Sequence, residues 1–508
     1  MNDQRIGYLL FITFSALVFG VAVFACKRAR IRNIDDFVAG GRRVGLGLIA
    51  SSVMMSWVWT TTILGSAEAG LWFGVTGGFH YAWGAIVPFL VFVPVALRLR
   101  RIMPNLTTFT EFVMERYGKA THTTFLIYAI AVCFYVYTEQ LIGAGILYEA
   151  SFGVSYGLVV VLTSCTVTAY IAIGGLRGSL FTDVFQFFVF ALATAIVLPW
   201  FLSAVGGTPA LYQGLSQLAS TGPSPNPDLL RWGSLAGFRY GMTALVVAMG
   251  QVLFAQGYYQ RAISAASDRH LRWGYLIGGV LAWFPIPLAY GTILGSASLV
   301  LGPGAGQIES TTGIAPFLIG KYLGAAGTIG FVVLTHMAAT STADTSLSGV
   351  QSILVVDLYR RIFGERRQDN AHQILFGRLT TIAFGLLSAG VALLAKGVSL
   401  LAFDIFSGIL FAAPVGAFLF GVFSRRTSPG VALFSTGAGL AAGLASWALI
   451  PDTEINWFVG NVISLCLPVI LLFVLTPLFR RKFDFGRLRQ WRPSHWVDDP
   501  ARTLPEEV

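Results

Sequence analysis

Long apolar segments recur along the whole chain, and few structures can bury so many of them. Thirteen stretches are apolar over the roughly 20 residues that a helix needs to cross a bilayer. Of the 508 residues, 55% are hydrophobic and only 11% are charged, which falls outside the range of soluble proteins. The sequence therefore predicts an all-α, polytopic membrane protein. The predicted spans are 6–26, 44–69, 77–97, 123–151, 157–173, 182–205, 237–258, 273–300, 327–357, 378–395, 398–423, 430–450 and 459–479.

The basic residues predict the orientation of these spans. If the helices alternate in direction, 29 of the 34 Lys and Arg residues fall on one side of the membrane. They lie in the predicted loops 27–43, 98–122, 174–181, 260–272, 360–378 and 424–429 and in the tail from 480. Cytoplasmic loops carry such an excess, so we predict an external N-terminus and a cytoplasmic C-terminus. Topology alone then accounts for the net charge of +10, which gives no indication of a nucleic-acid partner.

The chain divides into five predicted parts. An extra N-terminal helix and its cytoplasmic loop occupy 1–43, and an external loop occupies 206–236. Spans two to six form a first half at 44–205, and spans seven to eleven form a second half at 237–426. Two accessory helices and a basic cytoplasmic tail occupy 427–508. Because the halves are offset by five helices, an odd number, the second would be inverted relative to the first.

The second span has an unusual centre for a membrane helix. Hydroxyl residues and two tryptophans crowd the stretch from Ser51 to Ser66. Packing through small polar residues is one explanation. The other is a discontinuous helix whose freed carbonyls coordinate an ion, with the seventh span as its counterpart.

A second polar patch lies in the ninth span. Hydroxyls and one carboxylate, Asp344, run from Thr335 to Ser346 between apolar flanks. An ionisable group at the bilayer centre costs about 2.5–3.5 kcal/mol, so such groups usually mark an ion or substrate path. Hydroxyl and carbonyl oxygens favour a hard cation such as sodium.

Four motifs, in this order, resemble the sodium:solute symporter family. They are Gly174-Gly175-Leu176-Arg177 with Thr182-Asp183 and Gln186, then Gln260-Arg261, then Ser341-Thr342 with Asp357, and finally Gly408, Pro414 and Gly421. The resemblance covers roughly residues 35–430. It implies a leucine-transporter-type fold, a five-plus-five inverted repeat, and Na⁺ as the coupling ion.

The family resemblance also implies a sodium site between the second and ninth spans. Its ligands would be the carbonyls of Met55, Val58 and Ala338 with the hydroxyls of Ser341 and Thr342. Alternatively, each hydroxyl would bond to the carbonyl one turn earlier in its own helix.

A second cation site is a further expectation, because the chain resembles members that carry sialic acid. Its ligands would be Asp183, Asp344 and Thr345. Two acids at one site repel each other unless a cation or a proton lies between them. The alternative for Asp183 is an N-terminal helix cap.

The substrate expectation rests on a resemblance to the high-affinity urea transporter branch, carried by residues 56–66 and 74–85. Urea is planar and neutral, with four N–H donors and one acceptor. A urea site would use Trp57 and Trp59 as aromatic faces and Thr62, Glu139, Gln256 and Asp404 as acceptors. An amino acid, a polyamine or a monocarboxylate, and coupling to protons, remain alternatives.

Other classes of protein fit the sequence less well. The chain has no Walker-type phosphate loop and no nucleophile–base pair, so neither an ATP-driven pump nor an enzyme is expected. A sensor fused to a signalling domain and a passive channel are two further classes that the sequence leaves open. We expect a multi-pass protein of the cell membrane with the lipid bilayer and a small molecule as its partners. The sequence does not determine the oligomeric state.

Overall fold

The computed structural model describes residues 4–29, 38, 40–221, 227–302, 309–359, 370–453, 455–479 and 482–492. Within these ranges the chain is helical and has no β-strand; one isolated bridge joins Val44 and Ala265. Residues 360–369 of the predicted loop at 360–378, and residues 480–481 and 493–508 of the predicted tail, lie outside the described residues.

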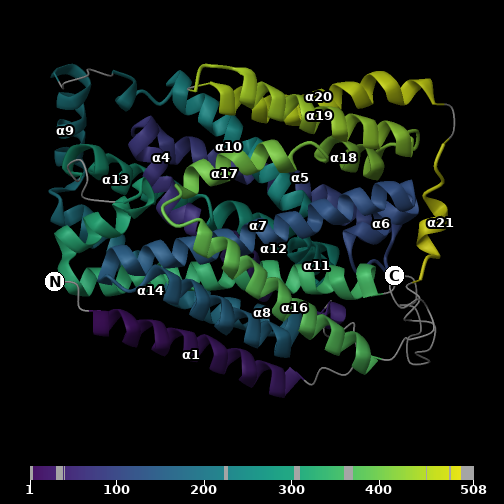
Figure 1. Cartoon of the computed structure of the whole chain (residues 1–508), viewed down its shortest axis with the longest axis horizontal. Coiled ribbons are helices and arrows are strands. Elements are labelled where there is room, and N and C mark those ends of the chain that lie inside the picture. The colour runs from purple at the N-terminus through teal and green to yellow at the C-terminus, as the bar shows by residue number, and fades with distance from the viewer. Residues whose placement is uncertain are drawn as a thin grey trace.

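The helices run mostly along the long axis of the molecule (Figure 1). The longer ones are α1 (Gln4–Ala29), α5 (Thr76–Ile102), α7 (Lys119–Phe152), α8 (Tyr156–Ala204), α10 (Leu235–Phe254), α13 (Pro285–Leu301), α14 (Ile314–Ile353), α16 (Asn370–Leu394), α19 (Pro429–Leu449) and α20 (Asn456–Leu475). The shorter ones include α3 (Leu46–Trp57), α4 (Ser66–Phe73), α6 (Phe109–Tyr117), α9 (Gly207–Thr221), α11 (Gln256–Ser264), α12 (Asp268–Tyr275), α17 (Leu400–Phe411), α18 (Val415–Phe423) and α21 (Gly486–Arg489).

The number of spans depends on how α8 is counted. Among the described residues, ten helices can cross a membrane. The number rises to twelve if two bent pairs, α3 with α4 and α17 with α18, each form one span. The predicted spans all overlap a helix or a bent pair, and the fifth and sixth share α8. The backbone of α8 leaves helical geometry at Gly175 (φ 52°, ψ −147°), a conformation suited to glycine. The count of thirteen and the orientation of the termini stay predictions.

Two helices are broken where the sequence predicts discontinuity. In the second span, α3 and α4 are bent by 63° across a break at Val58 and Trp59. In the seventh span, Ala255 interrupts the chain between α10 and α11 with an extended backbone (φ −81°, ψ 107°). The prediction of a discontinuous helix in the second span is therefore confirmed.

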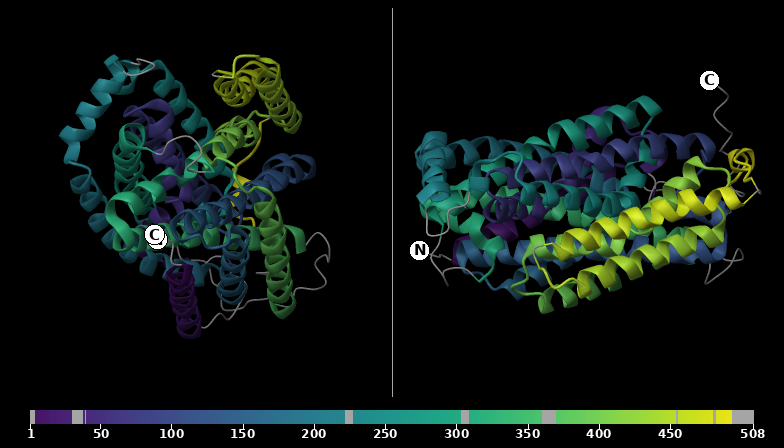
Figure 2. Two further views of the ribbon diagram at one scale, coloured as in Figure 1. Left: turned by 60° about the vertical axis from the view of Figure 1, so that its left-hand side comes forward. Right: turned by 90° about the horizontal axis from the view of Figure 1, so that it is seen from above.

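Helices α1, α19 and α20 form the outer layers of the bundle, and the broken helix α4 lies between these layers (Figure 1). In Figure 1, α1 lies along the lower edge and the adjacent helices α19 and α20 lie along the upper edge, and Figure 2 shows α19 and α20 side by side again. Between these layers the broken helix α4 crosses α13 closely. A Cβ atom on Gly70 would lie 2.3 Å from the carbonyl oxygen of Gly291, so this crossing requires glycine.

The two broken helices are tied together at one end. The backbone N–H of Val44 donates to the carbonyl of Ser264 at 2.9 Å, and the N–H of Ala266 donates to the carbonyl of Val44 at 2.9 Å. The amide of Gln260 adds a bond to the carbonyl of Val38 at 2.8 Å. The segments before α3 and after α11 therefore form one connected unit.

Some predicted loops contain helices. The predicted cytoplasmic loop at 98–122 contains α6, and the predicted external loop contains α9. Part of the predicted loop at 260–272 belongs to α11, and Arg261 there is fully buried. Counting Arg261 among the cations of this loop was wrong, because it is paired with Asp183 inside the bundle.

Candidate functional site

The break between α3 and α4 leaves backbone carbonyls without helical donors. Two of them are taken by side chains. The carbonyl of Ser56 accepts bonds from Trp59 Nε1 (2.9 Å) and Tyr258 Oη (3.1 Å). The carbonyl of Trp57 accepts a bond from Trp283 Nε1 at 2.6 Å. Aromatic side chains thus hold the broken segment in place.

The carbonyls on either side of these two face α14. The hydroxyl of Thr342 lies 3.4 Å from the carbonyl oxygen of Met55 and 3.2 Å from that of Val58. One hydroxyl has one proton, so it can satisfy at most one of the two carbonyls with a full hydrogen bond. Three oxygens around one point suit a small cation. Of the predicted sodium ligands, the structure thus brings these three together, while Ala338 lies one turn before Thr342 on α14.

A buried guanidinium lies among the residues predicted for a second cation. Arg261 Nη2 is 2.8 Å from Asp183 Oδ2, and both side chains are fully buried. The same nitrogen donates to Thr345 Oγ1 at 2.7 Å and to Ser179 Oγ at 2.9 Å. Ser341 Oγ donates to Asp183 Oδ1 at 2.5 Å. The positive charge beside Asp183 is therefore supplied by the protein, and Ser341 is engaged with a carboxylate.

Asp344 occupies a ring of hydroxyls next to this ion pair. It accepts bonds from Ser179 (2.6 Å), Tyr170 (2.9 Å) and Thr182 (3.0 Å). Ser179 connects the two carboxylates, because its hydroxyl also accepts the bond from Arg261. Neither acid lies at the start of a helix, so the alternative of a capping role for Asp183 is wrong.

A small cavity lies beside the broken segment. It has about 10 Å³ of open space, roughly what one water molecule needs, so a larger solute does not fit in it in this conformation. Gln251 Nε2 donates to Asp404 Oδ1 at 2.6 Å, and Tyr135 Oη donates to the same oxygen at 3.1 Å. Asp404 Oδ2 makes no hydrogen bond among the described residues. The lining residues are Trp57, Trp59, Thr62, Tyr81, Ala85, Ala244, Val247, Ala248, Gln251, Trp283 and Asp404.

Two predicted substrate residues do not line this cavity. Glu139 is fully buried on α7, one turn after Tyr135, and neither carboxylate oxygen has a hydrogen-bond partner among the described residues. Gln256 instead uses its whole amide on the loop before α6, accepting from the N–H of Phe109 (3.2 Å) and donating to the carbonyl of Thr107 (2.9 Å). Gln251, one turn before the break in the seventh span, occupies the place expected for Gln256.

Glu68 on α4 is an acid that the sequence analysis missed, although an acid within an apolar span is itself a signal. Its carboxylate accepts bonds from the hydroxyls of Thr311, Thr312 (3.0 Å) and Ser399 (2.7 Å) and from the N–H of Leu401 (3.3 Å). Glu68 thus joins the broken helix to the segment before α14 and to the start of α17. We call this contact the Glu68 clasp.

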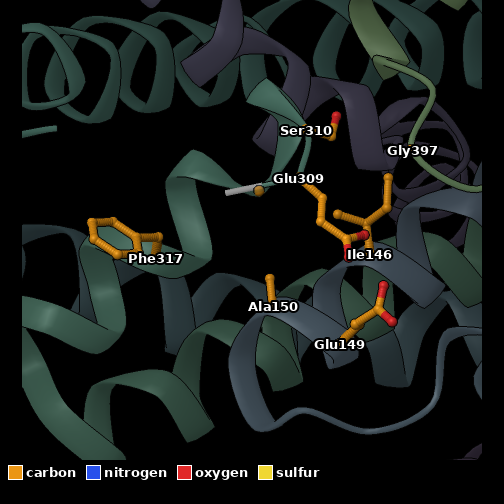
Figure 3. Close-up of a pocket in the computed structure, with 8 residues that line it drawn as sticks. Ile146, Glu149, Ala150, Glu309, Ser310, Phe317 and Gly397 are labelled. Carbon is orange, nitrogen blue, oxygen red and sulfur yellow. The ribbon is translucent and has the colours of Figure 1, made fainter. Parts of the chain in front are cut away.

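An open cavity of about 220 Å³ lies next to the Glu68 clasp, between the end of α7 and the segment before α14 (Figure 3). In Figure 3, Phe317 stands across the open space from Glu149 and Glu309. Lys396 Nζ lies 2.9 Å from a carboxylate oxygen of Glu149 and 3.6 Å from one of Glu309. The hydrogen bond to Glu149 raises the pKa of Lys396, which thus stays protonated beside two carboxylates of the cavity lining.

Replacing Glu68 with glutamine should loosen the clasp. The amide has only one acceptor oxygen, and a hydrogen bond to a charged group contributes about 1.5–3 kcal/mol. We expect the amide hydrogens of residues 400–402 to exchange about 10-fold faster or more, as measured by hydrogen–deuterium exchange. Peptides from α19 serve as the internal control, and unchanged exchange at 400–402 would contradict the clasp.

Comparisons with known proteins place the chain as a whole in a family. The sequence model of the sodium:solute symporter family matches residues 37–439. The chain is 29% identical to a probable urea active transporter of Schizosaccharomyces pombe, over 98% of this chain and 80% of that protein. It is 28% identical to a urea–proton symporter of Oryza sativa, over 96% of this chain and 73% of that protein. A solved Na⁺-coupled sialic acid symporter, substrate-bound and outward-open, has a TM-score of 0.75 at 22% identity and covers 94% of this chain and 98% of its own.

These matches extend over most of the chain. The family match includes both broken helices and the polar patch of α14. The structural likeness shows the same fold, and the proteins compared are transporters rather than enzymes, as the sequence predicts. The protein is a multi-pass membrane transporter, and it belongs to the sodium:solute symporter family.

Proposed function

We propose that the protein imports urea together with sodium by alternating access. The observation that carries this proposal is the pairing of two sites at one helix break. On one side lie the oxygens of Met55, Val58 and Thr342, and on the other lies the aromatic cavity with Asp404. Discontinuous helices with ion and substrate side by side are typical of coupled transporters.

The cavity suits a small, planar, neutral donor. Trp57 and Trp59 supply aromatic faces, with ring centroids 5.1 Å apart in an edge-to-face arrangement. Asp404 Oδ2 supplies an acceptor, and Thr62 and Gln251 supply further polar groups on the lining. The relatives named as urea transporters support urea over the other solutes. A cavity of about 10 Å³ has to widen before urea enters, which alternating access provides.

The oxygen cluster favours sodium over a proton as the coupling ion. Its three groups are two carbonyls and a hydroxyl, and none of them gains or loses a proton near neutral pH. We include Ala338 and Ser341 as further ligands, with Ser341 releasing Asp183 when sodium binds. Because Arg261 already lies against Asp183 and Thr345, the proposal contains one sodium and no second cation.

Uptake into vesicles tests the proposal. The purified protein is reconstituted and given an inward sodium gradient, an inward proton gradient or neither, with labelled urea, spermidine, proline and acetate in parallel. We expect urea to accumulate above its external concentration only with the sodium gradient. Accumulation driven by the proton gradient alone would show that the coupling ion is a proton and not sodium. Accumulation of another solute in place of urea would show that the proposed substrate is wrong.

A substitution at Thr342 tests the ion site separately. Thr342→Ala removes one oxygen, so we expect the sodium concentration for half-maximal uptake to rise about 10-fold, equivalent to roughly 1.4 kcal/mol. Thr342→Ser keeps the hydroxyl and is the matched control, with near-normal sodium dependence. If Thr342→Ala keeps the sodium dependence of the wild type, the site is misplaced.

A further inference from the structure

A basic cavity of about 640 Å³ opens near one end of the molecule, where α6 and α21 lie (Figure 1). Its walls are the end of α6, the segment between α18 and α19, and residues 479 and 482–487. Among the described residues, five cationic side chains line it, against two acids. The cations are Arg116, Arg425, Arg426, Lys482 and Arg487.

Two of these cations build the wall. Arg116 is buried, donates to the carbonyls of Gly421 (3.2 Å) and Ser424 (3.0 Å), and lies 4.6 Å from the ring centroid of Phe483. Arg487 lies 4.5 Å from the same centroid and donates to the carbonyl of Glu115 at 2.7 Å. Their guanidinium groups therefore fix the shape of the cavity.

The other three cations have no such partners. The side chains of Arg425, Arg426 and Lys482 are exposed, and within the described part of the chain they form no ion pair or hydrogen bond. Thr427 lines the same cavity, and its buried hydroxyl has no hydrogen-bond partner among the described residues. One lining acid, Asp484, is already engaged with the N–H of Gly486 at 2.8 Å. Three unpaired cations and an unpaired hydroxyl suit a phosphate group.

An apolar stripe leads into this basic cavity. Along α20 and the turn after it, exposed side chains recur at helical spacing, as for a face in contact with lipid tails. Phe479, which is 42% exposed, ends the stripe and also lines the cavity. A soluble anion would leave the stripe unused, whereas a phospholipid uses both surfaces. The exposed residues of the stripe are Ile470, Phe473, Val474, Leu478 and Phe479.

We propose that the basic cavity binds the phosphate headgroup of an anionic phospholipid whose acyl chains lie along α20. The cavity lies on the predicted cytoplasmic side, where bilayers carry anionic lipids and basic pockets between helices bind their headgroups. Arg425, Arg426 and Lys482 contact the phosphate, and Thr427 donates to it. The site is remote from the broken helices, and the proposal does not depend on the transported solute.

Thermal unfolding of the full chain in detergent tests this proposal. Phosphatidylglycerol, phosphatidylcholine with the same acyl chains, and inorganic phosphate are added at equal concentrations. We expect phosphatidylglycerol to raise the melting temperature more than phosphatidylcholine does, and phosphate alone to have no such effect. If phosphate alone gives the full shift, the ligand is a soluble anion and the lipid assignment is overturned.

A matched pair of variants locates the effect. Arg425→Gln with Arg426→Gln should lose at least half of the extra shift that phosphatidylglycerol gives, and Thr427→Val should lose part of it without a change in charge. The control, Arg269→Gln with Arg272→Gln, removes two exposed arginines of α12 and should keep the whole shift. A shift that survives in the first variant, or that falls equally in the control, overturns the proposal.

Discussion

Replacing Arg261 with glutamine should strongly destabilise the protein. The substitution leaves Asp183 buried without its cation and removes bonds to Ser52, Ser179 and Thr345. Breaking a buried ion pair by removing one partner costs about 3–5 kcal/mol. We expect a clearly lower melting temperature for the purified protein, with less of it recovered as a monodisperse peak in size-exclusion chromatography.

A second substitution separates charge from size. Arg261→Gln combined with Asp183→Asn removes both charges, so the double variant should regain most of the lost melting temperature. Arg261→Lys should not substitute for the arginine, because one ammonium cannot reach the groups that the guanidinium contacts. If Arg261→Gln unfolds at the temperature of the wild type, or if the double variant is no more stable than the single one, the ion pair does not hold these helices together.

Replacing Asp404 with asparagine should produce the largest effect on transport. The side chain keeps its size and its oxygen for Gln251 and Tyr135, but its second oxygen becomes an N–H₂ group. That group opposes the N–H donors of urea, and a hydrogen bond to a charged group contributes about 1.5–3 kcal/mol. We expect the urea concentration for half-maximal uptake to rise about 10- to 150-fold at an unchanged sodium requirement.

Tyr135→Phe is the matched control for this effect. It removes a donor to Asp404 Oδ1 while leaving the carboxylate and its second oxygen in place. Its effect on urea uptake should be much smaller than that of Asp404→Asn. Equal effects of the two substitutions would mean that Asp404 acts through the packing of α7 and α17 and does not contact urea.

The sequence predicted the features that depend on local chemistry. Hydroxyl and β-branched residues weaken the second span as a helix, and the structure breaks it at Val58 and Trp59. The predicted ligands Met55, Val58 and Thr342 meet because the hydroxyl pair of the ninth span lies opposite this break. The discontinuity of the second span could be inferred from its own residues, whereas the set of ligands followed from the family resemblance.

Other features depend on how the backbone turns at the breaks. Gln251 and Gln256 are five residues apart, about 140° around a regular helix, and the extended Ala255 lies between them. The sequence alone gives no reason to place one rather than the other beside the cavity, and it favoured Gln256, which binds the loop before α6. A small error in the predicted helical phase is therefore enough to assign the wrong glutamine to the cavity.

Partners that are far apart in the sequence could not be predicted, because only the packing of the helices brings them together. Glu68 meets residues more than 240 positions away, and Arg261 meets Asp183 across two halves of the chain. Counting Arg261 with the loop cations followed from its position after an apolar span. Only the packing of α11 against α14 and α3 shows that this charge lies inside the bundle.

The backbone bonds between Val44 and the end of α11 have a mechanical consequence. Each of the two predicted halves contributes one of the joined segments, so these hydrogen bonds oppose sliding of the segments past each other at this point. A passage at this end of the bundle must instead form when α3 and α11 move together, as one unit, away from the helices packed against them. The interface that opens would lie along α14, where Thr342 and Thr345 contact α3.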